Sequence, residues 1–149
     1  MKNTARAIIA IVALTSMSVA SARDDRLNFP IRAALEKGQS FKSKLDPDIA
    51  LYFGKQKTPA VEKKIGEWTS NKKTNAANKP DQEACEIAFL TAAIALQERA
   101  RREGGNAVIN IRSVYKKENV ESESEYLCGA GTIMAGVALR GTVVTIKKK

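Results

Sequence analysis

The most regular hydrophobic pattern of the chain lies between residues 81 and 103. Asp81 is a suitable N-cap, and three arginines followed by Gly104-Gly105 are typical of a helix C-terminus. Between these ends, apolar residues recur at three- and four-residue spacing, as on the packed side of a helix. We therefore predict one long helix over residues 81–103. The recurring apolar residues are Cys85, Ile87, Phe89, Leu90, Ala92, Ile94 and Leu96.

Beyond the double glycine the pattern changes from helix to strand. Residues 106–115 alternate between apolar and polar side chains, which is typical of a half-buried strand. Charged residues at 116–124 predict a hairpin turn, and a long β stretch follows at 125–146. Glycines interrupt this stretch at 129, 131, 136 and 141. They leave open whether it is one strand or two, because glycine in a strand often marks a bulge, a bend or a close backbone approach.

Upstream of the long helix the predicted elements are shorter. Pro30 in a first turn and Gly38 past an end predict a short helix over 30–38. Residues 49–53 form a β-type run that stops at Gly54.

Residues 61–69 are ambiguous. Their three apolar members have a helical spacing, but Gly66 weakens a helix, so we favour a second strand.

Two further segments upstream of the long helix predict no regular structure. Residues 23–29 are charged and expected to be loose, and residues 70–81, rich in asparagine and lysine, predict a mobile surface loop.

In order, the main elements are strand, strand, helix, strand, strand. This order favours an α+β fold in two layers, with one long helix packed on a small, mostly antiparallel sheet. Cys85, in the first turns of the helix, and Cys128, near the start of the last β stretch, predict one disulfide that staples the two layers. A two-thiolate metal site is the alternative, but zinc requires four ligands, so we predict no metal and no cofactor.

The N-terminus has the pattern of a secretory signal peptide. Two basic residues precede an apolar run at 7–14, and Ala20-Ser21-Ala22 is a small-x-small cleavage site. We predict a signal peptide over 1–22, with cleavage after Ala22. A retained membrane anchor is the alternative, but the run is too short to span about 30 Å of hydrocarbon. Residues 23–149 would then form a single periplasmic domain with no transmembrane anchor.

Charge favours anionic partners. The chain has 25 basic and 16 acidic residues, and without the two basic residues of the leader the net charge is +7. Export makes nucleic acid a poor candidate, whereas an envelope component fits. Six lysines form a candidate patch for an anionic partner, and the alternative is a surface that only confers solubility. The lysines are Lys55, Lys57, Lys63, Lys64, Lys72 and Lys73; the basic tail 147–149 is a solvated end or an electrostatic anchor.

Several chemistries are excluded or weakly indicated. The chain has no histidine, which excludes Ser-His-Asp and Cys-His triads, histidine zinc sites and a histidine pH switch. Gly136 and Gly141 have the spacing of a phosphate-binding loop, but Thr142 stands where a lysine is required. Paired carboxylates for glycan cleavage are conceivable, although such polar segments more often carry solvated charge. They are Asp46 with Asp48, and Glu121 with Glu123 and Glu125.

Much of the chain resembles a group of small exported bacterial proteins often catalogued as "excinuclease ATPase subunit". The resemblance rests on RDDRLNFPI, LDP, WTSNKKTNA, DQEACEIAFLTAAIALQERARREGGNAVINIRSVYKK and EYLCGAGTIMAGVALRGTVVTIK. More distantly, the helix, the GNAV entry at 105–108 and the closing strand are similar to the YbjQ-like group, which is catalogued as heavy-metal-binding, and to RcsF-like stress sensors. These resemblances imply a helix on a small sheet, and the RcsF-like one implies disulfide dependence. The chain lacks the lipid-bearing cysteine and the second cysteine pair of RcsF.

We expect a non-enzymatic periplasmic module that binds or senses an envelope component. Two alternatives stay open. One is a cell-wall-active enzyme that uses carboxylates. The other is a homo-oligomer that acts by self-association, as pentamer-forming YbjQ relatives imply.

Overall fold

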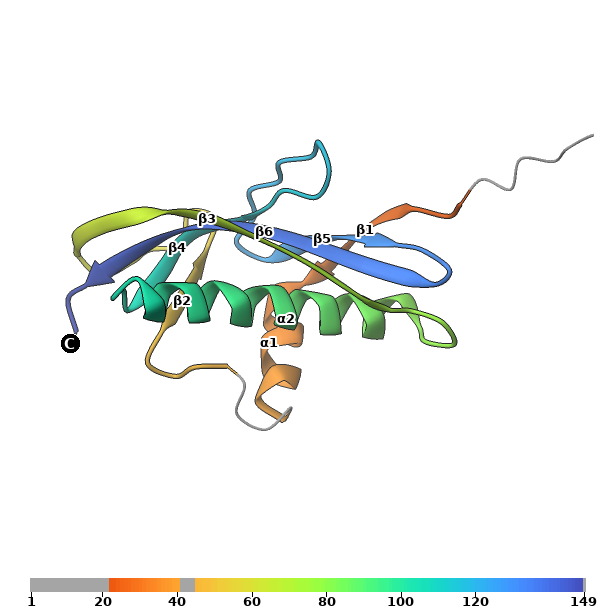
Figure 1. The fold of residues 1–149 in the computed structure, drawn as a ribbon, viewed down its shortest axis with the longest axis horizontal. Helices are drawn as coiled ribbons and strands as arrows, with labels where there is room; N and C mark the ends of the chain where they lie inside the picture. Colours follow the sequence, from red (N-terminus) through yellow and green to blue (C-terminus); the bar gives the residue numbers. More distant parts are fainter. Residues whose placement is uncertain (1–21, 41–44, 149) are drawn as a thin grey trace, which may run out of the picture.

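The computed structural model describes residues 22–40 and 45–148, so all of the predicted signal peptide except Ala22 lies outside the described residues. The described residues form six strands and two helices (Figure 1). In chain order these are β1 (Asp25–Pro30), α1 (Ile31–Ser40), β2 (Ala50–Phe53), β3 (Val61–Asn75), α2 (Asp81–Arg102), β4 (Ala107–Ser113), β5 (Glu125–Ala130) and β6 (Met134–Ile146).

Strand β6 is the centre of the sheet. Strand β3 pairs with it in antiparallel fashion along its whole length, from Asn75 opposite Met134 to Val61 opposite Ile146. The other side of β6 is shared end to end by β5, near Gly136, and by β4 farther along. Strand β1 extends the sheet beyond β5, and β2 extends it beyond β4 as a parallel neighbour.

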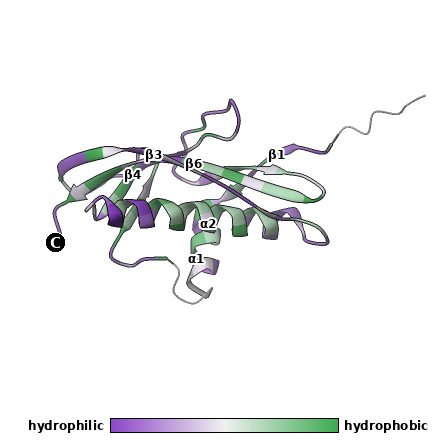
Figure 2. Ribbon diagram, viewed as in Figure 1, coloured by the Kyte–Doolittle hydropathy of each residue, from purple (hydrophilic) through white to green (hydrophobic). Residues whose placement is uncertain are grey.

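Helix α2 lies along one face of this sheet, which confirms the predicted long helix (Figure 1). Phe89 of α2 stacks on Tyr126 of β5, with 4.2 Å between ring centroids. Figure 2 shows hydrophobic residues along α2 and β6, and hydrophilic residues at the C-terminal end of α2. Helix α1 packs against α2 where Gly38 lies close to Leu90. In the described part of the chain, no helix is long and apolar enough to cross a membrane.

The predicted disulfide is confirmed. Cys85 of α2 is bonded to Cys128 of β5, and both side chains are fully buried. The bond joins the first turns of the helix to the sheet. The predicted N-cap is wrong by one residue, since Pro80 is the N-cap and Asp81 lies in the first turn. The Asp81 carboxylate accepts hydrogen bonds from Arg23, so it interacts with a side chain rather than with the helix end.

The α+β class and the mostly antiparallel sheet with its long helix are confirmed, but the predicted order of two strands on each side of the helix is wrong. Residues 23–29 are not loose, because β1 pairs with β5 and half-buries Leu27 and Phe29. A strand at the edge of a sheet can carry charge on its open face, which gave this segment the composition of a loop.

Residues 70–81 are not a loop throughout, because β3 continues to Asn75. Ser70, Lys72 and Thr74 are at least partly shielded, whereas their neighbours in the strand are exposed. Pairing with β6 continues along all of these residues, so the backbone ladder rather than apolar burial maintains the strand.

The chain turns back after β4, where Ser113 and Val120 form an isolated antiparallel bridge, but residues 116–124 do not join β4 and β5 into a hairpin. Strands β4 and β5 both pair with β6, and the hairpin joins β5 to β6 through a turn at residues 131–133. Two glycines of this hairpin face each other beneath the ring of Tyr115. A Cβ atom added at Gly129 would lie 2.2 Å from Cζ of Tyr115, which explains why the position needs glycine.

Candidate ligand-binding pocket

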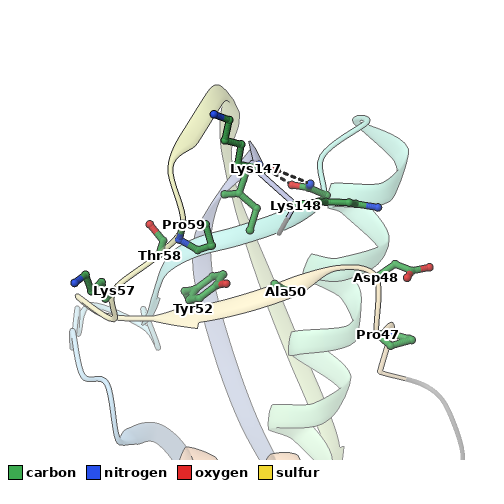
Figure 3. Close-up of a pocket in the computed structure, with 11 residues that line it drawn as sticks. Pro47, Asp48, Ala50, Tyr52, Lys57, Thr58, Pro59, Lys147 and Lys148 are labelled. Atoms are coloured by element: carbon green, nitrogen blue, oxygen red, sulfur yellow. Dashed lines mark hydrogen bonds between the residues drawn. The ribbon is translucent and has the colours of Figure 1, made fainter.

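A surface pocket of about 780 Å³ lies at the end of the sheet where β2, β4 and β6 meet, on the face that α2 leaves uncovered (Figure 3). Strand β2 contributes Ala50 and Tyr52, and the end of β6 contributes Ile146. The lining residues are Pro47, Asp48, Ala50, Tyr52, Lys57, Thr58, Pro59, Asn106, Ile146, Lys147 and Lys148.

The apolar part of the pocket is a small second core. Ala107, Val144 and Ile146 are buried together, and Ala50, Tyr52 and Ile109 pack against them. This cluster results from the alternation of side chains along β4 and β6. Every second residue faces α2, and the residues between them face the pocket. Val108 and Val143, which pair with each other, belong to the main core.

Asn106 holds the back wall of the pocket in place. Its side-chain oxygen accepts a hydrogen bond from the Ile146 N–H at 2.7 Å, and its side-chain N–H donates to the Ile146 carbonyl at 2.9 Å. Its own backbone N–H donates to Val144, and its carbonyl accepts from Ala50. Asn106 therefore links β2, β4 and β6. No local pattern in the sequence predicts this role of Asn106.

The rim of the pocket is mainly basic. Lys57, Lys147 and Lys148 are exposed, and no carboxylate of the described residues lies within 4 Å of their amino groups. Asp48 is the acid of the lining and lies 3.8 Å from the Arg101 guanidinium. Figure 3 shows the lysines projecting in different directions, with Lys57 beside Tyr52 and Lys148 on the side of Asp48. The positive charge is spread around the rim rather than focused on one point.

The structure separates the six predicted lysines. Lys57 lines the pocket, and Lys63 and Lys64 lie close by on β3, opposite the last residues of β6. Lys55 lies 4.0 Å from Glu121 in another cavity. The remaining two lysines belong to the distant half of β3, where Lys72 lies on the helix side and Lys73 near Gly136 on the other side. The pocket instead joins Lys57 to Lys147 and Lys148 of the basic tail.

The candidate carboxylates lie in two separate groups, and in the first group Asp46 and Asp48 both lie against the Arg101 guanidinium. Asp46 pairs with Arg101, whose guanidinium lowers the pKa of this carboxyl group. Glu121 and Glu123 line the cavity of Lys55, and Glu125 begins β5. Within residues 22–40 and 45–148, no group of three acidic or cysteine side chains is placed to hold a metal ion.

Comparison with known proteins adds no relative: no family model, no curated protein and no solved structure matches this chain.

Proposed function

We propose that the chain is a non-enzymatic binding module of the bacterial cell envelope, and that its pocket takes an extended anionic polymer. The observation that supports this best is the rim of Lys57, Lys147 and Lys148 around an apolar floor that includes Tyr52. The relationship to the YbjQ-like group stays a prediction.

The spread of charge favours a polymer over a small anion. A single phosphate is best held by donors that converge on one point, as at a helix N-terminus or in a loop of backbone N–H groups. Here the three ammonium groups project from different sides of an open pocket. A chain with repeated negative charges can contact all three at once, while its less polar parts lie against Tyr52 and Pro59.

Envelope location rests on the predicted leader, and the buried disulfide is compatible with it. A disulfide persists in oxidising compartments such as the bacterial periplasm and is rare in the cytosol. Acidic polymers of the envelope would meet a chain that carries a net positive charge.

The test is binding of fluorescent dextran sulfate, with uncharged dextran of the same length for comparison, measured by anisotropy at low salt. We expect binding of the sulfated polymer only, and weaker binding as salt screens the exposed charges. Replacing Lys57, Lys147 and Lys148 by glutamine should weaken binding roughly tenfold, as three exposed charge pairs would. Polygalacturonate, which carries carboxylates, then tells whether sulfate-like groups are required.

The matched control replaces Lys55, Lys72 and Lys73 by glutamine. It removes the same number of positive charges, but at positions outside the pocket. The control variant should bind as the unmodified protein does, and both variants should keep its thermal stability. Equal losses for the two variants would mean that only net charge matters, and the pocket would then have no role.

A further inference from the structure

The turn between β5 and β6 carries two exposed apolar side chains. Ile133 is 67 % exposed and Met134 is 46 % exposed. Among the described residues, the other exposed large apolar side chain is Val61, at the opposite end of the sheet. Figure 2 shows hydrophobic residues along this hairpin. Two adjacent apolar residues at a protruding turn differ from single apolar residues scattered over a surface, which are common.

The backbone holds this turn firmly. The Gly131 N–H donates to the Met134 carbonyl at 2.9 Å, and the Ala76 N–H donates to the Ile133 carbonyl at 2.7 Å. The second bond ties the hairpin to the turn that leads into α2. Ile133 and Met134 are therefore presented by a hydrogen-bonded scaffold, so less conformational entropy is lost when they enter an apolar environment.

Basic side chains flank the apolar tip. Lys73 lies next to Gly136 on β3, and Lys79 lies in the turn between β3 and α2. In the described part of the chain, neither ammonium group has a carboxylate within 4 Å. Arg23 also lies at this end, but its guanidinium pairs with Asp25 and Asp81. Glu83, in the first turn of α2, is an exposed acid of this end.

The start of β1 lies at the same end. A Cβ atom added at Gly131 would lie 3.0 Å from the Arg23 carbonyl oxygen. The described chain therefore enters β1 beside the apolar tip.

We propose that the hairpin end docks on a lipid surface that contains anionic headgroups. Ile133 and Met134 enter the boundary between headgroups and acyl chains, and Lys73 and Lys79 contact the headgroups. An apolar insertion combined with basic side chains is the arrangement by which proteins bind peripherally to anionic membranes. The pocket lies at the far end of β6 and would face away from this surface.

The experiment measures co-sedimentation of the full chain with phosphatidylcholine vesicles, with and without phosphatidylglycerol. We expect stronger binding to the vesicles with phosphatidylglycerol. Ile133→Ser combined with Met134→Ser should weaken it by at least about tenfold, because two apolar side chains no longer leave water. Lys73→Gln combined with Lys79→Gln should weaken binding to the anionic vesicles by roughly fivefold for each charge and leave the neutral vesicles unaffected.

Matched controls are Val61→Ser, and Lys63→Gln combined with Lys64→Gln, all at the other end of β3. Every variant carries the same N-terminal segment, so differences between variants report on the hairpin. Unchanged binding of the Ile133 and Met134 variant would overturn the proposal. So would a concentration-dependent dimer that this variant abolishes, because a second copy would then cover the tip. The pocket variant should bind vesicles normally, which separates this proposal from the polymer-binding one.

Discussion

At its Met134 end, strand β6 begins in a tight hairpin with an exposed apolar tip, whereas at its Ile146 end it leads into a basic tail beside a pocket. Its 13 residues place these ends about 40 Å apart. The hairpin end is apolar with basic flanks, and the pocket end is basic with an apolar floor. Different partners are proposed for the two ends, a lipid surface for the hairpin end and an anionic polymer for the pocket end.

The two ends are also held by different interactions. The disulfide between Cys85 and Cys128 lies in the hairpin half and joins the helix to the sheet. The pocket half depends on the hydrogen bonds of Asn106 and on the small core around Val144. A covalent bond maintains the helix against the sheet near one end, while the other end relies on interactions that one substitution can remove.

The largest effect is expected from breaking the disulfide. Replacing Cys85 and Cys128 by alanine should lower the free energy of unfolding by about 4 kcal/mol, because the bond closes a loop with a sequence separation of 43. Guanidinium unfolding measures this loss, and hydrogen exchange should show protection falling in β5 and the first turns of α2 before β4. A reductant should destabilise the unmodified protein but not the variant. Equal loss of protection at both ends would contradict the division into halves.

A smaller effect is expected at the pocket end. Asn106→Ala removes two hydrogen bonds to Ile146 and should lower the free energy of unfolding by about 1–2 kcal/mol. It should also weaken dextran sulfate binding without removing a charge, because Lys147 and Lys148 follow Ile146 directly. Asn71→Ala, on the exposed side of β3, is the control and should change stability by less than about 0.5 kcal/mol. Full polymer binding by the Asn106 variant would show that the tail needs no anchoring.

The smallest effect concerns pH. Hydrogen bonds from Arg26 and Lys116 lower the pKa of Asp24, at the hairpin end, from 3.8 to about 2. Between these values the unfolded chain binds more protons than the folded one, so this contribution is present above pH 3.8 and is lost as the pH falls toward 2. Asp24→Asn should therefore be less stable than the unmodified protein at neutral pH and equally stable near pH 2.

Thermal unfolding across this pH range measures the difference between the two proteins. Asp46→Asn makes the matching change at the pocket end, where Arg101 lowers the pKa of Asp46. A constant difference across the whole pH range would show that the Asp24 substitution acts through packing rather than through charge.

Local sequence patterns were sufficient to predict helix α2 and the disulfide between the two cysteines. A helix forms its hydrogen bonds within four residues, so spacing within residues 81–102 specified both the element and its buried side. Cys85 and Cys128 could be paired because the described chain has no other cysteine and a disulfide was the simplest use of the two. The strand at 61–69 could be favoured because Gly66 argues against a helix, but its continuation to Asn75 could not be predicted.

The other strands of the sheet depend on pairing between segments that are far apart in the chain. Residues 23–29 and 70–75 have the composition of loops, and they are strands only because β5 and β6 supply hydrogen-bonding partners far away in the chain. The pocket also depends on strand pairing. Lys57 and Lys147 are distant in sequence, and they line the same pocket because β2 and β6 lie on either side of β4. By itself the sequence determined the helix, the disulfide and the basic charge of the chain, because these depend on residue type and local spacing. Only the tertiary structure decided which polar segments join the sheet and which lysines share a surface, because strand pairing depends on partners that no local pattern identifies.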